Sequence, residues 1–325
     1  MRRREFIWAL GGVAVSWPLA VGAQQPMPVI GFLNSASPGG YAPMLKAFRQ
    51  ALKEAGFVEG RNVGIEYRWA EGQYDRLPVM AADLVRRDVA VIVANTPANV
   101  AAKNATTKIP IIFTTGNDPV QLGLVTSLNR PSGNFTGVTT LAVELAPKRL
   151  ELAHELFPTA RVIGVLVNPK NSAQALVVTR DLQAAATNLG LQLIVQHASA
   201  ESEIEDAFAT LTQKRVGALV IAADSFFNSM AAKLGELALR NSVPAIFAYH
   251  EFAAAGGLAS YSGSITDSYR LAGLYTGRIL KGEKPADLPV QESTKVELIF
   301  NLKSAKTLGI SIPITLLGRA DEVIE

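Results

Sequence analysis

The sequence predicts an α/β protein of two Rossmann-like lobes with parallel sheets, joined by a three-segment hinge, with a ligand cleft between the lobes. Three observations predict this class. Short apolar runs alternate with amphipathic helical patterns, the order of these elements occurs twice, and the strand-like run IPIIF of residues 109–113 returns as VPAIF at 243–247. A polar tip follows each run, and open parallel sheets hold ligands beyond the carboxyl ends of their strands. Both tips are therefore expected to face the cleft.

The first 23 residues have the pattern of an export signal and stand apart from the fold. Three arginines at 2–4 precede an apolar stretch from Phe6 to Val21, and small residues at 21–23 suit a signal peptidase. The run RREFI from Arg3 resembles the twin-arginine signal, with an ordinary secretory signal as the alternative. Because the chain has no cysteine, no lipid anchor is expected. We therefore expect an exported, soluble protein in the periplasm.

The composition narrows the classes of function. The 325 residues are 49% hydrophobic, which suffices for two lobes of about 100–150 residues each. Without the signal the net charge falls from +3 to about +1, and this gives no electrostatic case for a nucleic-acid partner. The absence of cysteine excludes disulfides and thiolate catalysis, and neither a metal nor another cofactor is expected.

The first lobe is predicted to contain four strands and three helices. Strand-like runs occupy 29–33, 63–69, 89–94 and 109–113, and helical patterns occupy 41–55, 76–87 and 97–106. In the first helix Leu45, Phe48 and Leu52 recur three to four residues apart, and a glycine follows the end of the pattern. The run at 89–94 is apolar throughout, as expected of a strand in a parallel sheet that is covered on both faces.

The second lobe repeats this order before the chain crosses back. Strands are predicted at 162–167, 191–196, 217–222 and 243–247, and helices at 173–189, 201–213 and 227–240. Further runs at 258–261, 267–280 and 296–301, with a link near 137–140, indicate about three connections between the lobes. The predicted N-terminal lobe is 24–138 plus about 262–288, and the C-terminal lobe is 139–261 plus about 289–325.

Catalytic chemistry has little support in the sequence. No metal-binding histidine pair, phosphate-binding loop or nucleophile elbow is present, and neither His154 nor His197 has a carboxylate partner at an obvious spacing. His250 and Glu251 form the one ionisable pair at a strand tip. An acid–base pair, a ligand contact and a solvated loop all remain open for these two residues.

Polar and aromatic residues near the ends of strands form the candidate ligand site, which consists of Ser35, Thr96, Asp118, Asn168, Asp224, Phe226, Tyr249, Glu251 and Tyr261. Ser35 and Thr96 precede helical patterns and suit a ligand carboxylate. Asp118 or Asp224 suits an ammonium group, and the aromatic residues suit the walls of a cleft. The structural alternatives are a helix cap for Thr96, an Asx turn for Asp118 and core packing for the aromatic side chains.

Five segments also carry a resemblance to a known family. They are YDRLPVMAADLVRRDVAVIVA (74–94), ATTKIPIIFTTGNDPVQLGLVTSLNRPSGNFTGVT (105–139), AGGLASYSGS (255–264), YTGRILKGEKPADLPVQESTKVELIFNLKSAKTLGI (275–310) and LLGRADEVIE (316–325). Through them the chain from about Met27 to Glu325 resembles the ABC-transporter substrate-binding family with the type I periplasmic-binding-protein fold, in its tryptophan- and tyrosine-binding branch. The family's ligand lies between the lobes, touched by loops that match Ser35, Thr96, Asp118, Asn168, Asp224 and Tyr249.

The resemblance implies a binding protein that closes about its hinge on a small-molecule solute, passes it to a membrane permease with its ATPase, and catalyses no reaction. A monomer is expected. For the solute, an aromatic or branched amino acid is favoured over a sugar. One alternative is a sensory solute-binding protein that docks on a receptor. A less favoured alternative is a secreted hydrolase or lyase that uses His250 and Glu251.

Overall fold

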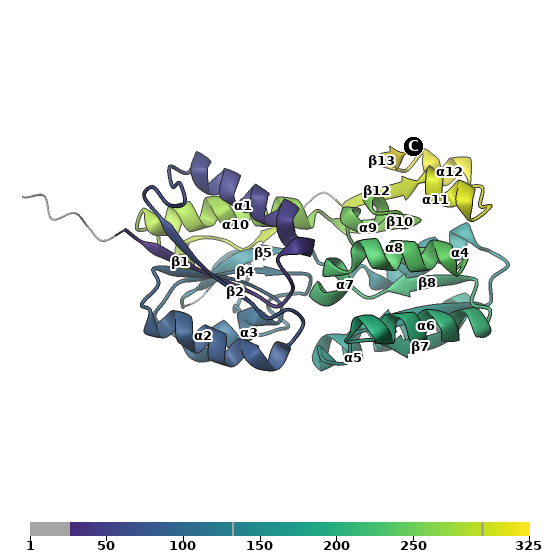
Figure 1. The fold of residues 1–325 in the computed structure, drawn as a ribbon, viewed down its shortest axis with the longest axis horizontal. Helices are drawn as coiled ribbons and strands as arrows, with labels where there is room; N and C mark the ends of the chain where they lie inside the picture. The colour runs from purple at the N-terminus through teal and green to yellow at the C-terminus, as the bar shows by residue number, and fades with distance from the viewer. Residues whose placement is uncertain (1–26, 132, 294–295) are drawn as a thin grey trace, which may run out of the picture.

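The computed structural model describes residues 27–131, 133–293 and 296–325, and it forms two α/β lobes that lie side by side along the long axis (Figure 1). The predicted export signal, with its twin-arginine run, lies outside these described residues. Within them, no helix has the length and apolar character needed to cross a membrane. The two-lobed α/β class predicted from the alternating runs is confirmed.

The first lobe contains a six-stranded parallel sheet in the order β11-β5-β4-β3-β1-β2. Its strands are β1 (Val29–Asn34), β2 (Gly64–Trp69), β3 (Val91–Asn95), β4 (Ile111–Thr115), β5 (Phe135–Thr139) and β11 (Gln291–Glu292). Every residue of β3, β4 and β5 is buried, which is the pattern of central strands covered on both faces.

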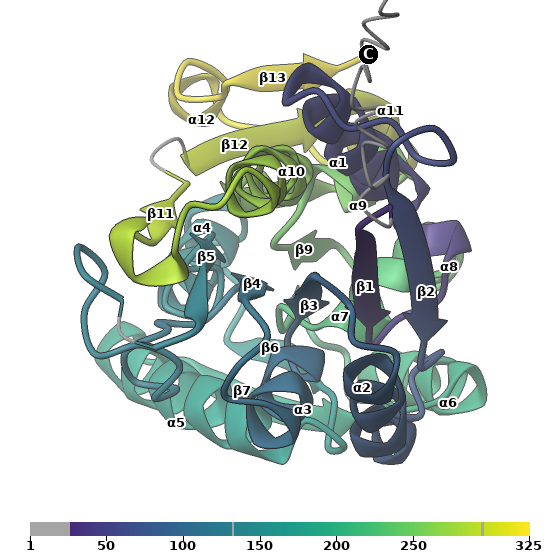
Figure 2. The same cartoon turned by 90° about the vertical axis from the view of Figure 1, so that its left-hand side faces the viewer.

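Helices cover both faces of this first sheet, as Figure 2 shows. One pair is α1 (Ala42–Glu54) and α10 (Ile265–Leu280), and the other pair is α2 (Leu77–Arg86) and α3 (Ala98–Ala105). Short 3-10 turns lie at Gly39–Tyr41, Tyr74–Arg76 and Pro285–Asp287. The helix α10 packs against α1 although it is more than 200 residues later in the chain, so the chain has returned to the first lobe by this point.

The second lobe contains a seven-stranded sheet in the order β13-β12-β10-β9-β8-β6-β7. Its strands are β6 (Val162–Val167), β7 (Gln192–His197), β8 (Ala218–Ile221), β9 (Ala245–Phe247), β10 (Ala259–Gly263), β12 (Val296–Asn301) and β13 (Glu322–Ile324). The pairing of β10 with β12 is antiparallel, whereas the other pairings are parallel. The prediction of parallel sheets therefore needs one correction, because β12 enters the second lobe from the opposite direction.

The helices of the second lobe are α4 (Ala146–Leu156), α5 (Ser172–Leu189), α6 (Glu201–Gln213), α7 (Ser225–Ser229), α8 (Ala231–Arg240), α9 (His250–Ala254), α11 (Leu302–Thr307) and α12 (Ile314–Leu317). The single helix predicted at 227–240 is therefore two helices, which begin earlier and break at Met230. The early start has a local cause, because the Asp224 side chain caps the first turn of α7 by accepting from the Phe226 amide.

The chain passes between the lobes three times, after β5, after β10, and between β11 and β12. One large apolar cluster continues through both lobes, with Phe32 and Phe48 in the first and Phe227 and Phe247 in the second. The fold thus holds the polar strand tips of both lobes around a common space.

Candidate ligand-binding site

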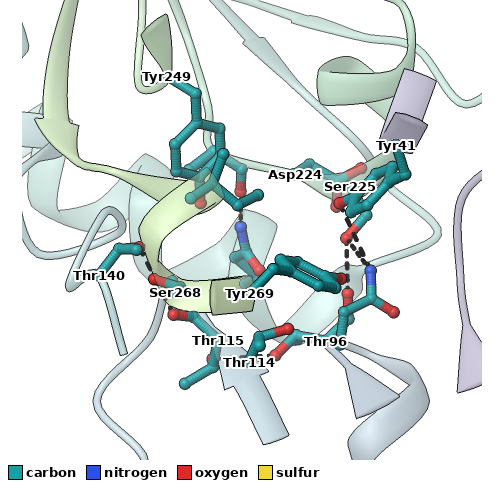
Figure 3. A pocket seen from close by; sticks show the side chains of 15 residues that line it. Tyr41, Thr96, Thr114, Thr115, Thr140, Asp224, Ser225, Tyr249, Ser268 and Tyr269 are labelled. Atoms are coloured by element: carbon teal, nitrogen blue, oxygen red, sulfur yellow. Dashed lines mark hydrogen bonds between the residues drawn. The ribbon is translucent and has the colours of Figure 1, made fainter. Parts of the chain in front are cut away.

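A cavity lies between the lobes at the carboxyl ends of their strands (Figure 3). The residues that line it are Tyr41, Asn95, Thr96, Thr114, Thr115, Gly116, Thr140, Gln174, Ala223, Asp224, Ser225, Tyr249, Ile265, Ser268 and Tyr269. Both polar tips of the repeated strand contribute, since residues 114–116 end β4 and Tyr249 follows β9. The first lobe adds the end of β3 and part of α10, and the second lobe adds the loop after β8.

Three buried tyrosines give the cavity aromatic walls with polar tips. Burial raises the pKa of the Tyr249 hydroxyl to about 12, and it also raises the pKa values of Tyr41 and Tyr269 well above the usual value. All three phenols are therefore neutral at physiological pH and can donate a hydrogen bond. The Tyr41 and Tyr269 rings meet edge to face, with centroids 5.8 Å apart.

Threonine hydroxyls add a second polar surface. The Thr96 hydroxyl donates to Thr115 Oγ1 at 2.9 Å, so those two side chains satisfy each other in part. The hydroxyl of Thr114 is buried in the wall of the cavity and has no partner with good hydrogen-bond geometry, although it interacts with the nearby Tyr269 hydroxyl. A buried hydroxyl that is poorly satisfied costs free energy, so a polar group placed in the cavity could gain a hydrogen bond from it.

Direct hydrogen bonds join the lobes beside the cavity. Asn95 of the first lobe donates through Nδ2 to Ser225 Oγ of the second at 2.9 Å. The Ser225 hydroxyl donates in turn to the Thr96 carbonyl at 2.8 Å, and these bonds are visible in Figure 3. Outside the cavity, the Tyr74 hydroxyl donates to Asp224 Oδ1 at 3.1 Å. The lobes are therefore in contact, and the cleft is closed.

Asp224 organises the second lobe's side of the cavity. Its carboxylate accepts from the Phe226 amide at 2.9 Å, from Asn168 Nδ2 at 2.9 Å and from Asn171 Nδ2 at 3.0 Å, in addition to the bond from Tyr74. One negative side chain thus caps a helix, orders the loop after β6 and meets the opposite lobe. These bonds fix the orientation of the carboxylate in the cavity wall.

The structure brings part of the predicted site together. Thr96, Asp224 and Tyr249 line the cavity. Ser35 lies directly behind it, where its hydroxyl donates to Asn95 Oδ1 at 3.2 Å, and Asn168 supports Asp224. Phe226 is buried at the start of α7 against its neighbouring phenylalanine, with ring centroids 5.5 Å apart.

The other predicted residues lie elsewhere. Asp118 Oδ1 accepts from the amide of Val120 at 2.8 Å, which is the Asx turn considered as its structural alternative. Glu251 accepts from Thr266 of the first lobe at 2.7 Å near the hinge. Tyr261 lines a separate pocket on the second lobe. None of these three is among the residues that line the cavity.

His250 and Glu251, the acid–base pair of the less favoured alternative, are not among the residues that line the cavity either. His250 Nε2 lies 3.3 Å from a carboxylate oxygen of Glu322 in β13, whereas Glu251 is directed to the hinge. Among the described residues, no group of three or more His, Cys, Asp or Glu side chains is placed to hold a metal ion.

Several residues that line the cavity were not predicted from the sequence. Tyr269 lies within the apolar stripe of α10, and the sequence pattern of such a helix does not separate a core tyrosine from one that faces a cavity. Tyr41 precedes α1 and has the same ambiguity. Gln174 lies in α5, where it is buried although it is polar, and its side-chain amide donates to the Ala223 carbonyl.

Comparisons with known proteins agree with this geometry. A family model described as ABC transporter substrate binding protein matches residues 36–324. A curated protein named tyrosine-binding protein, from Clostridioides difficile, is 30% identical over 267 residues, which cover 82% of this chain and 76% of that protein. A conserved domain protein from Vibrio cholerae has a solved structure with 26% identity and a TM-score of 0.82, covering 91% of this chain and 99% of that one.

Two further solved structures differ in their ligand state. A complex with L-Trp from Streptococcus pneumonia has 27% identity, covers 91% of this chain and 99% of that one, and gives a TM-score of 0.79. A ligand-free, open substrate binding protein from Clostridium difficile has 26% identity and covers 92% of this chain and 99% of that one, yet its TM-score is only 0.61. The lobes here are thus arranged more like those of the L-Trp complex, in agreement with the contacts between them. Members of the matched family bind solutes and are not enzymes, and on the extent of the match this chain belongs to the ABC transporter substrate-binding protein family.

Proposed function

We propose that this protein is the periplasmic solute-binding component of an ABC importer. It captures a small amphipathic solute between its lobes by hinge closure and delivers the solute, as a monomer, to a permease and its ATPase. The cavity carries this proposal, because polar strand tips from both lobes line one space and direct hydrogen bonds close the lobes around it. Such a site forms fully only in the closed state, as capture by closure requires.

The proposed solute is an aromatic or branched amino acid. Tyr41, Tyr249 and Tyr269 offer apolar ring faces, and the hydroxyls of the cavity offer donors and acceptors for a polar group. The described residues that line the cavity include no Lys, Arg or His, so a ligand carboxylate would be held by neutral donors. Relatives named for tyrosine binding or solved with L-Trp support the same class of solute.

A pair of threonine variants tests the proposal. The protein is unfolded and refolded to remove any bound solute, and binding of L-amino acids is measured by calorimetry and thermal melting. An aromatic amino acid at about a hundred times its Kd should stabilise the fold by about 2.7 kcal/mol. Thr114→Val replaces a poorly satisfied hydroxyl by a methyl group, so we expect affinity to fall about three- to tenfold without loss of stability.

Thr136→Val is the matched control. Thr136 is also fully buried, but its hydroxyl donates to the Leu288 carbonyl at 2.7 Å in the body of the first lobe. This variant should lose stability and keep its affinity. The proposed solute class is wrong if the unaltered protein binds no L-amino acid. The proposed location is wrong if Thr114→Val binds as tightly as the unaltered protein.

A further inference from the structure

An apolar groove opens beside the cavity, and it also lies between the two lobes. Polar residues, Lys170 among them, line part of the groove, and its apolar wall is formed by the side chains of Leu77, Pro78, Pro97, Val100, Ala101, Leu122 and Ala173. Six of these seven come from α2, α3 and adjoining loops of the first lobe, and Ala173 comes from the first turn of α5 in the second. The groove, like the cavity, is therefore complete only when the lobes are together.

The cavity and the groove adjoin each other but differ greatly in size. Thr96 and Gln174 line both. The cavity has a volume of about 40 Å³, and the groove has a volume of about 330 Å³. On this measure one water molecule needs about 10–15 Å³, so the closed cavity accepts about three water-sized groups. An aromatic amino acid has several times that number of non-hydrogen atoms.

The two spaces also differ in chemistry. Hydroxyl and amide groups make up a larger share of the cavity wall than of the groove wall, where aliphatic side chains and proline rings predominate. Val100 in the groove wall is 40% exposed, so the groove reaches the surface and offers apolar area that a bound molecule can cover. A small, more polar space beside a larger, more apolar one matches the two ends of an amphipathic solute.

We propose that the solute lies across both spaces, with its compact polar end in the cavity and its apolar part in the groove. This inference rests on the proposed function, because it places the two ends of the proposed amino acid. The ligand class is then an α-amino acid with a large apolar side chain. Because the groove opens at the surface, the far end of that side chain tolerates extension.

A graded set of probes tests this arrangement. Binding of L-alanine, L-leucine, L-tyrosine and O-benzyl-L-tyrosine to the refolded protein is measured by calorimetry. Affinity should rise at least about tenfold from L-alanine to L-tyrosine, because more apolar area is covered. O-benzyl-L-tyrosine should bind at least as tightly as L-tyrosine. Equal affinities along the series, or rejection of the benzyl compound, would overturn the inference.

Two valine variants locate the apolar part. Val100→Asp places a charge in the groove and should weaken O-benzyl-L-tyrosine about tenfold or more while changing L-alanine less than about twofold. Val79→Asp is the control, because Val79 is 70% exposed on α2 and does not line the groove. If both variants bind the long probe equally, the groove does not hold the solute and the inference is overturned. If no α-amino acid binds the unaltered protein, the proposed function falls together with this inference.

Discussion

The contact between Gly40 and Ser229 offers a sharp test of lobe closure. Gly40 belongs to the turn before α1 in the first lobe, and Ser229 ends α7 in the second. A Cβ atom at Gly40 would lie 2.5 Å from the Ser229 Cα, 2.8 Å from its Cβ and 2.9 Å from its carbonyl oxygen. Real Cβ atoms do not approach other atoms so closely, so the lobes of a Gly40→Ala variant must separate to relieve the contact.

The size of the effect follows from the cost of overpacking. Forcing one extra methyl group into a packed contact costs about 1–3 kcal/mol. This contact exists only in the closed state. The apparent Kd should therefore rise roughly 5- to 150-fold, while the stability of the solute-free protein changes little. Calorimetric titration with the tightest-binding amino acid gives the affinity. Small-angle X-ray scattering at one fixed solute concentration gives the radius of gyration, which should be larger than that of the unaltered protein because less of the variant is closed.

Gly39→Ala is the adjacent control. A Cβ at Gly39 meets no atom within 4 Å, so the same substitution one residue earlier should leave both affinity and radius of gyration unchanged. Equal affinities for the two variants would refute the reasoning, because they would show that solute binding does not require this contact between the lobes.

Two further predictions concern tyrosines. Tyr74→Phe removes the hydroxyl that donates to Asp224 and accepts from Asn168 at 3.3 Å. Solute affinity, measured by titration, should therefore fall about three- to thirtyfold. An unchanged Kd would contradict a role for the bond between Tyr74 and Asp224 in lobe closure. The raised pKa of Tyr249, about 12 against an ordinary 10.0, stabilises the fold fully below about pH 10 and progressively less from there to about pH 12. Urea unfolding between pH 8 and 11 should therefore show a smaller alkaline loss of stability in Tyr249→Phe, and identical losses would count against that pKa.

The sequence predicts the architecture well because buried parallel strands have a strong signature. The apolar run that forms β3 is short and rich in β-branched residues, which favours a buried strand over a helix. The strand β5 has the composition FTGVT, with two threonines and a glycine, and the sequence places only a link near it. Its five residues are nevertheless all buried, since β4 and β11 flank it in the sheet.

The site is harder to predict because the type of a residue does not determine where its side chain points. Asp118 and Asp224 both follow apolar strands, so the sequence alone does not show which of them binds the ligand. In the structure Asp118 bonds to its own loop, whereas Asp224 lies in the cavity wall. Tyr261 lies on β10 with its side chain in a different pocket, and one residue of register decides which face of a sheet a strand residue takes.

The hydrogen bonds between Asn95, Ser225 and Thr96 have a consequence for kinetics. If the part of the solute that lies in the cavity can leave only after these bonds between the lobes break, its dissociation rate cannot exceed the opening rate of the protein. Hinge motions of this kind take microseconds to milliseconds. Solutes that differ in their contacts within the cavity would then share one upper limit on their exchange. The shortest residence time is thus a property of the protein rather than of the solute.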